Sequence, residues 1–277
     1  MSSILTNHSA MTALSTLRNI NTNLSSTQNK ISTGLAISSG KDNAAYFSIS
    51  KTMSGDSGMY KAIDENLTLQ KNAVSTARLG AETVVDLAKQ FVERVAFAQG
   101  GTQEVRSDVQ NELDELVARI DTTIKQSTFN GTDYVNAATS TAVVTVVTGI
   151  SRSSTGAIST TTMTFNEQAL GAIKTALAGI NVSAAATGTE LSSAEGELSK
   201  AISAATAFGI AEKSIETQKE FLGALTDRID GGIGSMVDAN METEAARLQA
   251  LQVQQQLATQ SLSIANSSPQ NILSLFR

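Results

Sequence analysis

The chain lacks, or almost lacks, four residue types that often carry structural or catalytic chemistry. Its 277 residues include no Cys and no Trp, one Pro (Pro269) and one His (His8). The absence of cysteine excludes disulfides and cysteine-based metal sites. A single histidine excludes the paired-histidine motif of zinc proteases. One proline, close to the end of the sequence, leaves long helices uninterrupted. We therefore expect a helical protein packed mainly through small residues.

Charge and hydropathy exclude further classes. Twenty basic and 26 acidic residues give a net charge of -6 and a pI near 4.9. No block of Lys or Arg marks a nucleic-acid-binding surface. No run approaches the ~18 apolar residues of a membrane span, and no basic segment followed by an apolar stretch marks a Sec-type signal peptide. We expect neither a nucleic-acid partner nor membrane insertion.

No constellation of residues indicates catalysis. The segment 34–42 is similar to a phosphate-binding loop, but its glycines are one residue too far apart. Asp42 also stands where a Ser or Thr should hold magnesium. Paired carboxylates such as Asp227 and Asp230 fit a solvated helix face. We therefore predict that the chain is not an enzyme, with no catalytic, metal or cofactor-binding residues and no cofactor.

The two ends of the chain carry matching amphipathic patterns. Over residues 10–35 and 248–272, apolar side chains recur in steps of three, four or seven, which is typical of one helix face. Each stretch spans on the order of 40 Å as a helix. The opposite faces are rich in Asn, Ser, Thr and Gln. We expect the two helices to pair with each other and to pack against further neighbours through Leu14, Leu17, Ile20, Leu24, Ile31, Leu248, Leu251, Leu257, Leu262 and Ile264.

Between these ends, three long helices are predicted. Residues 63–95 place apolar side chains in alternating steps of four and three, which is the signature of a coiled coil. A second helical pattern covers 105–124, before an Asn130-Gly131 turn. A seven-residue repeat follows over 194–236. The predicted core residues are Val74, Val84, Phe91, Val95, Leu116, Ile120, Phe208, Ile215, Leu222 and Ile229.

Two local features bound these helices. Asp42 is well placed as the N-cap of the first long helix, which we expect to begin at Asn43. Glycines at 231, 232 and 234 are expected to loosen the last long helix before the C-terminal one.

One segment has a different composition. Ser and Thr make up about half of residues 135–166. The β-branched run 141–148 predicts a strand, with a hairpin partner over 158–165. Exposed turns are the first interpretation of the Ser/Thr-rich tip, with O-glycosylation as the alternative. The candidate O-glycosylation residues are Ser151, Ser153, Ser154 and Thr155.

The order of the elements is mirrored, because the chain runs out through long helices and returns through another. We therefore predict a mainly α fold: a rod-like antiparallel helical bundle or coiled coil with a small β-hairpin, and with the N- and C-terminal helices paired at one end. The predicted domains are terminal helices over 1–40 and 238–277, a helical core over 41–135 and 185–237, and a short variable β-hairpin region over 136–184.

Several motifs resemble a known family. Residues 4–7, 17–24 and 31–45 look like the N-terminal domain of bacterial flagellins. The Ser-Thr-Phe-Asn-Gly segment 127–131 matches the end of the second core helix in that family. The C-terminal match is sharper and almost residue for residue over 236–244, 256–266 and 269–277. The resemblance covers about 1–135 and 185–277 and leaves 136–184 in the position of the family's variable region.

This resemblance implies a function. The chain is expected to be a secreted, extracellular subunit that polymerises into the flagellar filament for motility, after export in unfolded form through the flagellar type III apparatus. The terminal helices would line an inner tube, and the long helices with the hairpin would form an outer tube. The implied partners are other flagellin subunits, a filament cap, hook-junction proteins and an export chaperone. Alternatives are a hook–filament junction protein and a type III-secreted translocator.

Two departures from the family pattern stand out. An Arg-rich segment of many flagellins is recognised by the animal innate receptor for flagellin. Counting back from Phe129, the key Arg position falls on Ala88, whereas Glu112 matches the family's acidic contact. We predict weak receptor activation. Ala36 also replaces an Arg that is common in the family.

Overall fold

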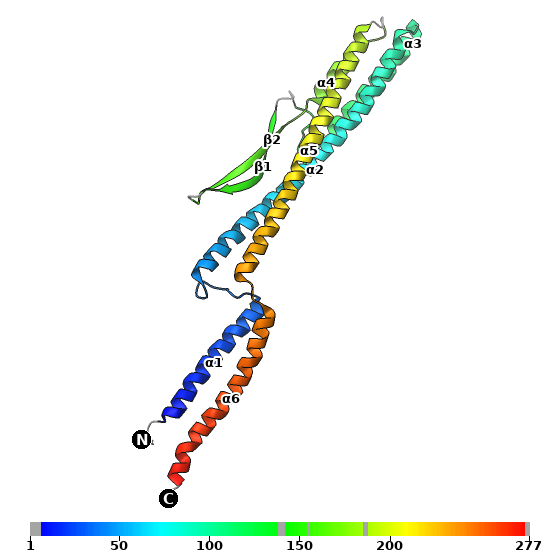
Figure 1. Cartoon of the computed structure of the whole chain (residues 1–277). Coiled ribbons are helices and arrows are strands. Elements are labelled where there is room, and N and C mark those ends of the chain that lie inside the picture. Colours follow the sequence, from blue (N-terminus) through cyan, green and yellow to red (C-terminus); the bar gives the residue numbers. More distant parts are fainter. Residues whose placement is uncertain (1–6, 138–141, 154–155, 185–187, 275–277) are drawn as a thin grey trace. The chain divides into compact units, whose positions relative to one another are not determined.

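The computed structural model describes residues 7–137, 142–153, 156–184 and 188–274, with side chains described to residue 267 (Figure 1). This part of the chain forms six helices and one two-stranded antiparallel sheet, which confirms a mainly α fold with a small β-hairpin. In order, the elements are α1 (His8–Thr33), α2 (Ala44–Gln99), α3 (Gln103–Gln126), β1 (Val143–Arg152), β2 (Ile158–Asn166), α4 (Leu170–Ala178), α5 (Gly188–Val237) and α6 (Met241–Ser274).

The chain divides into two compact units. The terminal unit comprises Met1–Ser57 and Arg228–Arg277, and the core unit comprises Gly58–Asp227. These divisions fall within α2 and α5, whereas the domain boundaries predicted from the sequence fall at the turns beside α1 and α6. Each unit is described separately below.

The core unit is built around rows of fully buried side chains. In α2 the buried row includes Val74, Ala81 and Phe91, at intervals that a coiled coil requires. In α5 it consists of alanines in the first half and mainly larger residues from Phe208 onward. Burying each such large side chain contributes roughly 1.5–3 kcal/mol. Nine of the ten predicted core residues are buried here; the tenth, Ile229, is half-buried and belongs to the terminal unit.

Ion pairs accompany this packing between α2 and α5. Lys71 Nζ lies 3.0 Å from Glu216 Oε1, and Arg78 Nε lies 2.7 Å from Glu212 Oε2. Hydrogen bonds from Lys71, and then from Lys213, lower the pKa of Glu216. At such partly exposed positions ion pairs add little stability, so they mainly orient the two helices.

The β-hairpin packs on the helices through β1. Its register contains a bulge between Val147 and Gly149, and Val146 and Thr148 are buried. Gln218 Nε2 donates to the Thr148 carbonyl at 2.9 Å, and the Tyr60 hydroxyl donates to the Ile150 carbonyl at 3.1 Å. β2 is the outer strand, and most of its residues are exposed.

The N-cap predicted for α2 is wrong. The cap is Asn43, whose Oδ1 accepts from the backbone N–H groups of Ala45 and Tyr46 at 3.1 and 3.2 Å. Asp42 instead folds back, and its Oδ2 accepts from the backbone N–H groups of Ser38 and Ser39, at 3.0 Å each. These bonds, with the Ser39 bond first, lower the pKa of Asp42. The helix begins one residue later than predicted, so Asp42 organises the preceding turn.

The glycine cluster does not interrupt α5, contrary to the expectation from sequence. The helix continues to Val237, although glycine costs up to about 1 kcal/mol per residue in a helix. Contacts within the terminal unit hold this segment. Ser57 Oγ lies 2.6 Å from Asp230 Oδ1, and the Val237 carbonyl accepts from the Ala36 N–H at 2.7 Å.

Candidate subunit-assembly surface

The terminal helices α1 and α6 lie side by side, as predicted (Figure 1). They run antiparallel, since Asn7 Nδ2 donates to the Ala265 carbonyl at 2.8 Å and Gln255 Nε2 donates to Asn21 Oδ1 at 2.7 Å. Their less exposed residues fall in alternating steps of three and four, which defines one seam. The seam residues are Ala10, Ala13, Leu17, Ile20, Leu24, Thr27 and Ile31 in α1, and Glu244, Leu248, Leu251, Gln255, Ala258, Leu262 and Ala265 in α6.

This seam buries little apolar surface. Within α1, which is described in full, Thr27 is the one buried residue. In the described part of α6, Glu244 and Leu251 are buried. Ordering a residue costs about 1–2 kcal/mol of backbone entropy, and a well-packed helix recovers this through burial. The seam therefore provides too little burial to stabilise two long helices.

Among the described residues, six large apolar side chains of these helices are exposed and lie outside the seam. Leu14 is 37% exposed, Leu257 57% and Ile264 71%, and Met11, Met241 and Val253 are also exposed. We call these six residues the outward apolar set. Exposed apolar residues are ordinary when scattered, but here they occur on helices that lack a core of their own. They are available to a further partner.

The predicted packing residues thus divide between two surfaces. Leu17, Ile20, Leu24, Ile31, Leu248, Leu251 and Leu262 lie in the seam, and Leu14, Leu257 and Ile264 point outward. The small residues Ala258 and Ala265 occupy the seam positions beside Leu257 and Ile264. These small residues leave a shallow groove of about 540 Å³ between α1 and α6. The groove is lined by Ser9, Thr12, Ala13, Thr16, Ala258, Ser261 and Ala265.

Glu244 is a buried carboxylate with poor partners. It is 8% exposed, and its Oε1 lies 3.8 Å from Lys30 Nζ and 3.7 Å from Arg247 Nη1. Its Oε2 is buried and has no hydrogen-bond partner among the described residues. A buried charge that lacks hydrogen bonds costs free energy. Glu244 therefore weakens the pairing of α1 with α6. Neither the spacing nor the composition of the sequence indicated this.

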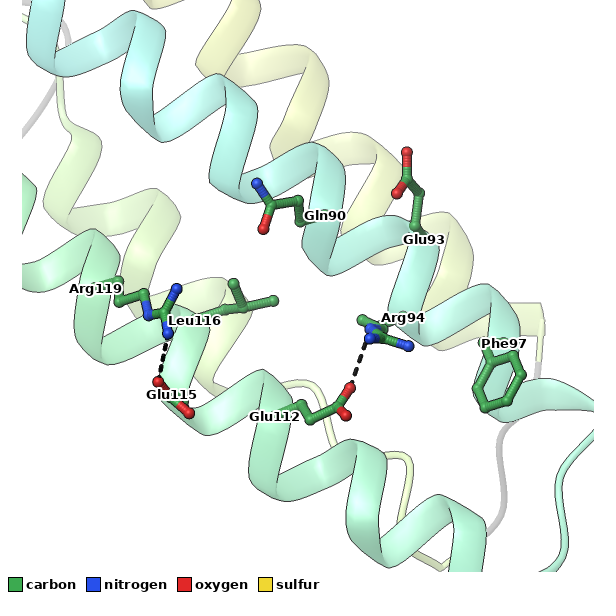
Figure 2. Close-up of a pocket in the computed structure, with 8 residues that line it drawn as sticks. All are labelled: Gln90, Glu93, Arg94, Phe97, Glu112, Glu115, Leu116 and Arg119. Carbon is green, nitrogen blue, oxygen red and sulfur yellow. Dashed lines mark hydrogen bonds and ion pairs between the residues drawn. The ribbon is translucent and has the colours of Figure 1, made fainter.

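A hollow between α2 and α3 contains the acidic residue matched to the family's receptor contact (Figure 2). Its volume is about 480 Å³. Arg94 reaches across from α2, and its Nε lies 3.0 Å from Glu112 Oε2, with both side chains half-exposed. Phe97 lies exposed at the rim. Ala88, in contrast, is fully buried, so its methyl group is not part of this surface.

The remaining sequence predictions concern O-glycosylation, metal binding and membrane insertion. Ser151 and Ser153 are exposed, and Ser151 Oγ lies 2.8 Å from Ser159 Oγ; Ser154 and Thr155 lie outside the described residues. No cluster of three metal-ligating side chains occurs in the described part of the chain. Over the same residues, no helix has the length and hydropathy to cross a bilayer.

The paired terminal helices, with a thin seam and exposed apolar side chains, are the kind of surface found in a subunit of a larger assembly. Two family models match the chain. The bacterial flagellin N-terminal helical region matches residues 4–140, and the bacterial flagellin C-terminal helical region matches residues 191–276. The chain belongs to the bacterial flagellin family.

Individual relatives support this membership. A flagellin of Brucella melitensis is 39% identical over 281 positions, and flagellin C of Rhizobium meliloti is 32% identical over 322 positions. Both alignments cover all of this chain and all of the relative. The crystal structure of Bacillus cereus flagellin covers 66% of this chain and 94% of its own, with 17% identity and a TM-score of 0.36. That score is too low to support an argument about the fold.

The seam generates a prediction about Glu244. Glu244→Met removes the under-paired charge and keeps the volume, so the α1–α6 pair should gain about 1 kcal/mol or more. In the assembled filament, where both helices are ordered, hydrogen exchange should be slower in α1 and α6 than in the parent filament. Glu242→Met is the matched control, because Glu242 is exposed in the same first turn and loses only a small helix-dipole contribution. Faster exchange in Glu244→Met than in the parent chain would contradict this account.

Proposed function

We propose that this chain is the structural subunit that polymerises into the bacterial flagellar filament, an extracellular propeller for motility. The observation that carries the proposal is the thin α1–α6 seam beside the outward apolar set. The same two helices lie within the segments that match the flagellin terminal regions. An isolated subunit leaves this surface in water, and a polymer of identical subunits covers it.

Assembly then supplies the free energy that the seam lacks. Fully burying a side chain such as Leu257 or Ile264 contributes about 1.5–3 kcal/mol. Contacts of this kind from neighbouring subunits offset the ordering entropy of the terminal helices. We infer that α1 and α6 are disordered in the free subunit and fold on binding to neighbouring subunits. Such a chain also suits export in unfolded form through the flagellar type III apparatus, since it has no disulfide to break.

Further partners follow from family membership alone. They are a filament cap at the tip, hook-junction proteins at the base and an export chaperone. A hook–filament junction protein shares the terminal pattern, but it would not polymerise into long filaments when purified. A type III-secreted translocator would bind liposomes. Self-polymerisation without liposome binding therefore distinguishes the proposed function from both alternatives.

The outward apolar set generates the test of assembly. Ile264→Ser leaves an exposed residue exposed in the free subunit but removes a buried contact from the filament. We expect the critical concentration for polymerisation, measured by sedimentation of filaments, to rise about tenfold or more. Ile264→Leu keeps the apolar area and should polymerise like the parent chain. Equal critical concentrations for the parent chain and the Ser variant would rule out this residue as an assembly contact.

The α2–α3 surface generates a prediction about the host. Glu112 is paired with Arg94, and Ala88 provides no exposed side chain. We expect weak activation of the animal innate receptor for flagellin by the purified subunit in a cell reporter assay. A protease-treated sample controls for contaminants. Full-strength signalling, equal to that of a flagellin with the family's Arg, would contradict the prediction.

A further inference from the structure

The outer strand β2 has an edge without the usual protection against strand pairing. From Ile158 to Asn166 it contains no charged residue and no proline. Soluble proteins usually protect such an edge with Lys, Pro, a bulge or a covering element. The bulge of this hairpin lies in β1. Apart from its ladder with β1, the β2 backbone makes one hydrogen bond among the described residues, from Gln168 Nε2 to the Asn166 carbonyl at 3.1 Å.

The other strand of the hairpin is already engaged. Gln218 and Tyr60 donate to the carbonyls of Thr148 and Ile150 in β1. The side chains of Val146 and Thr148 are buried. A partner strand that paired with β1 would have to displace these helix side chains. β2 is therefore the strand at which the sheet can be extended.

We propose that β2 pairs with β2 of a second copy of this chain, to form a four-stranded sheet in the order β1-β2-β2-β1. In an antiparallel pair centred on Thr162, the central positions of the strand bring threonine opposite threonine, and the flanking pairs are Thr161–Met163, Ser159–Phe165 and Ile158–Asn166. In that register Thr160 lies opposite Thr164, and Thr162 lies opposite its own copy. Because β2 carries no charge, no like charges meet across the pair. Threonine pairs opposite each other across strands stabilise a sheet by about 0.2–1 kcal/mol each.

Symmetry determines where this contact can form. A pair of identical edges is related by a two-fold axis and closes on itself, whereas a helical filament grows through head-to-tail contacts. The β2 contact therefore joins two free subunits, or two filaments that lie side by side. This goes beyond the proposed function, because it concerns association between assembled filaments and not growth of one filament.

The absence of cysteine allows a direct crosslinking test. Opposite residues in antiparallel strands have Cα atoms about 4.5–5.5 Å apart, which is within reach of a disulfide. After mild oxidation of the full chain, Thr162→Cys should form a dimer with itself. Thr160→Cys should crosslink with Thr164→Cys, and more strongly than either does with itself. The control is Val143→Cys, which is 60% exposed at the far end of β1.

We expect at least about tenfold more dimer from Thr162→Cys than from Val143→Cys. Equal yields from the two variants would overturn the proposal, since they would report random collision. Thr162→Lys provides a second test, because it places like charges opposite each other at the two-fold axis. It should abolish lateral association of filaments in electron micrographs and dimers in sedimentation, whereas Val143→Lys should leave both unchanged.

The two proposals fail separately. Filaments that polymerise normally but show neither Thr162→Cys crosslinks between them nor an effect of Thr162→Lys would overturn the β2 contact and leave the proposed function intact. If the chain forms crosslinked dimers but never polymerises, the proposed function is overturned and the β2 contact stands.

Discussion

The shortage of buried apolar surface between α1 and α6 constrains the whole protein. Two helices of 26 and 34 residues meet along a seam in which α1 buries Thr27 alone. The seam also contains Glu244, a carboxylate with one oxygen unpaired among the described residues. Meanwhile Leu257 and Ile264 point into solvent. We infer that such a pair is unstable by itself and that a polymer of identical subunits supplies the missing contacts.

The core unit has the opposite balance. Phe91 and Phe208 are fully buried, and cross-helix ion pairs such as Arg78–Glu212 orient its helices. This unit has the burial needed to fold before assembly. We therefore propose that the subunit combines one part that folds alone with another that becomes ordered in the filament. Because the terminal helices lack a core of their own, the subunit can remain a monomer before assembly and still polymerise strongly when subunits meet.

The sequence predicted the elements better than their surfaces. The alternation of four and three in α2 marked its buried row, because a coiled coil leaves little freedom in which positions face inward. In the terminal helices the apolar stripe was broad, and periodicity could not show that Ala258 faces the seam while Leu257 faces outward. The burial of Ala88 and the role of Asn43 as the N-cap of α2 could not be predicted, because a shift of one residue along the helix changes both. The sequence also could not show which hairpin strand is the outer one. Gln218 and Tyr60 bind β1 and leave β2 at the edge, and both residues are distant in sequence from the hairpin.

Hydrogen exchange compared between the free subunit and the filament tests the central claim most directly. If assembly orders the terminal helices, amides in residues 10–35 and 245–270 should exchange rapidly in the free subunit and slowly in the filament. Amides in the buried rows of α2 and α5 should be protected in both states, which provides an internal control. Equally strong protection of both terminal helices in the free subunit and in the filament would contradict the account.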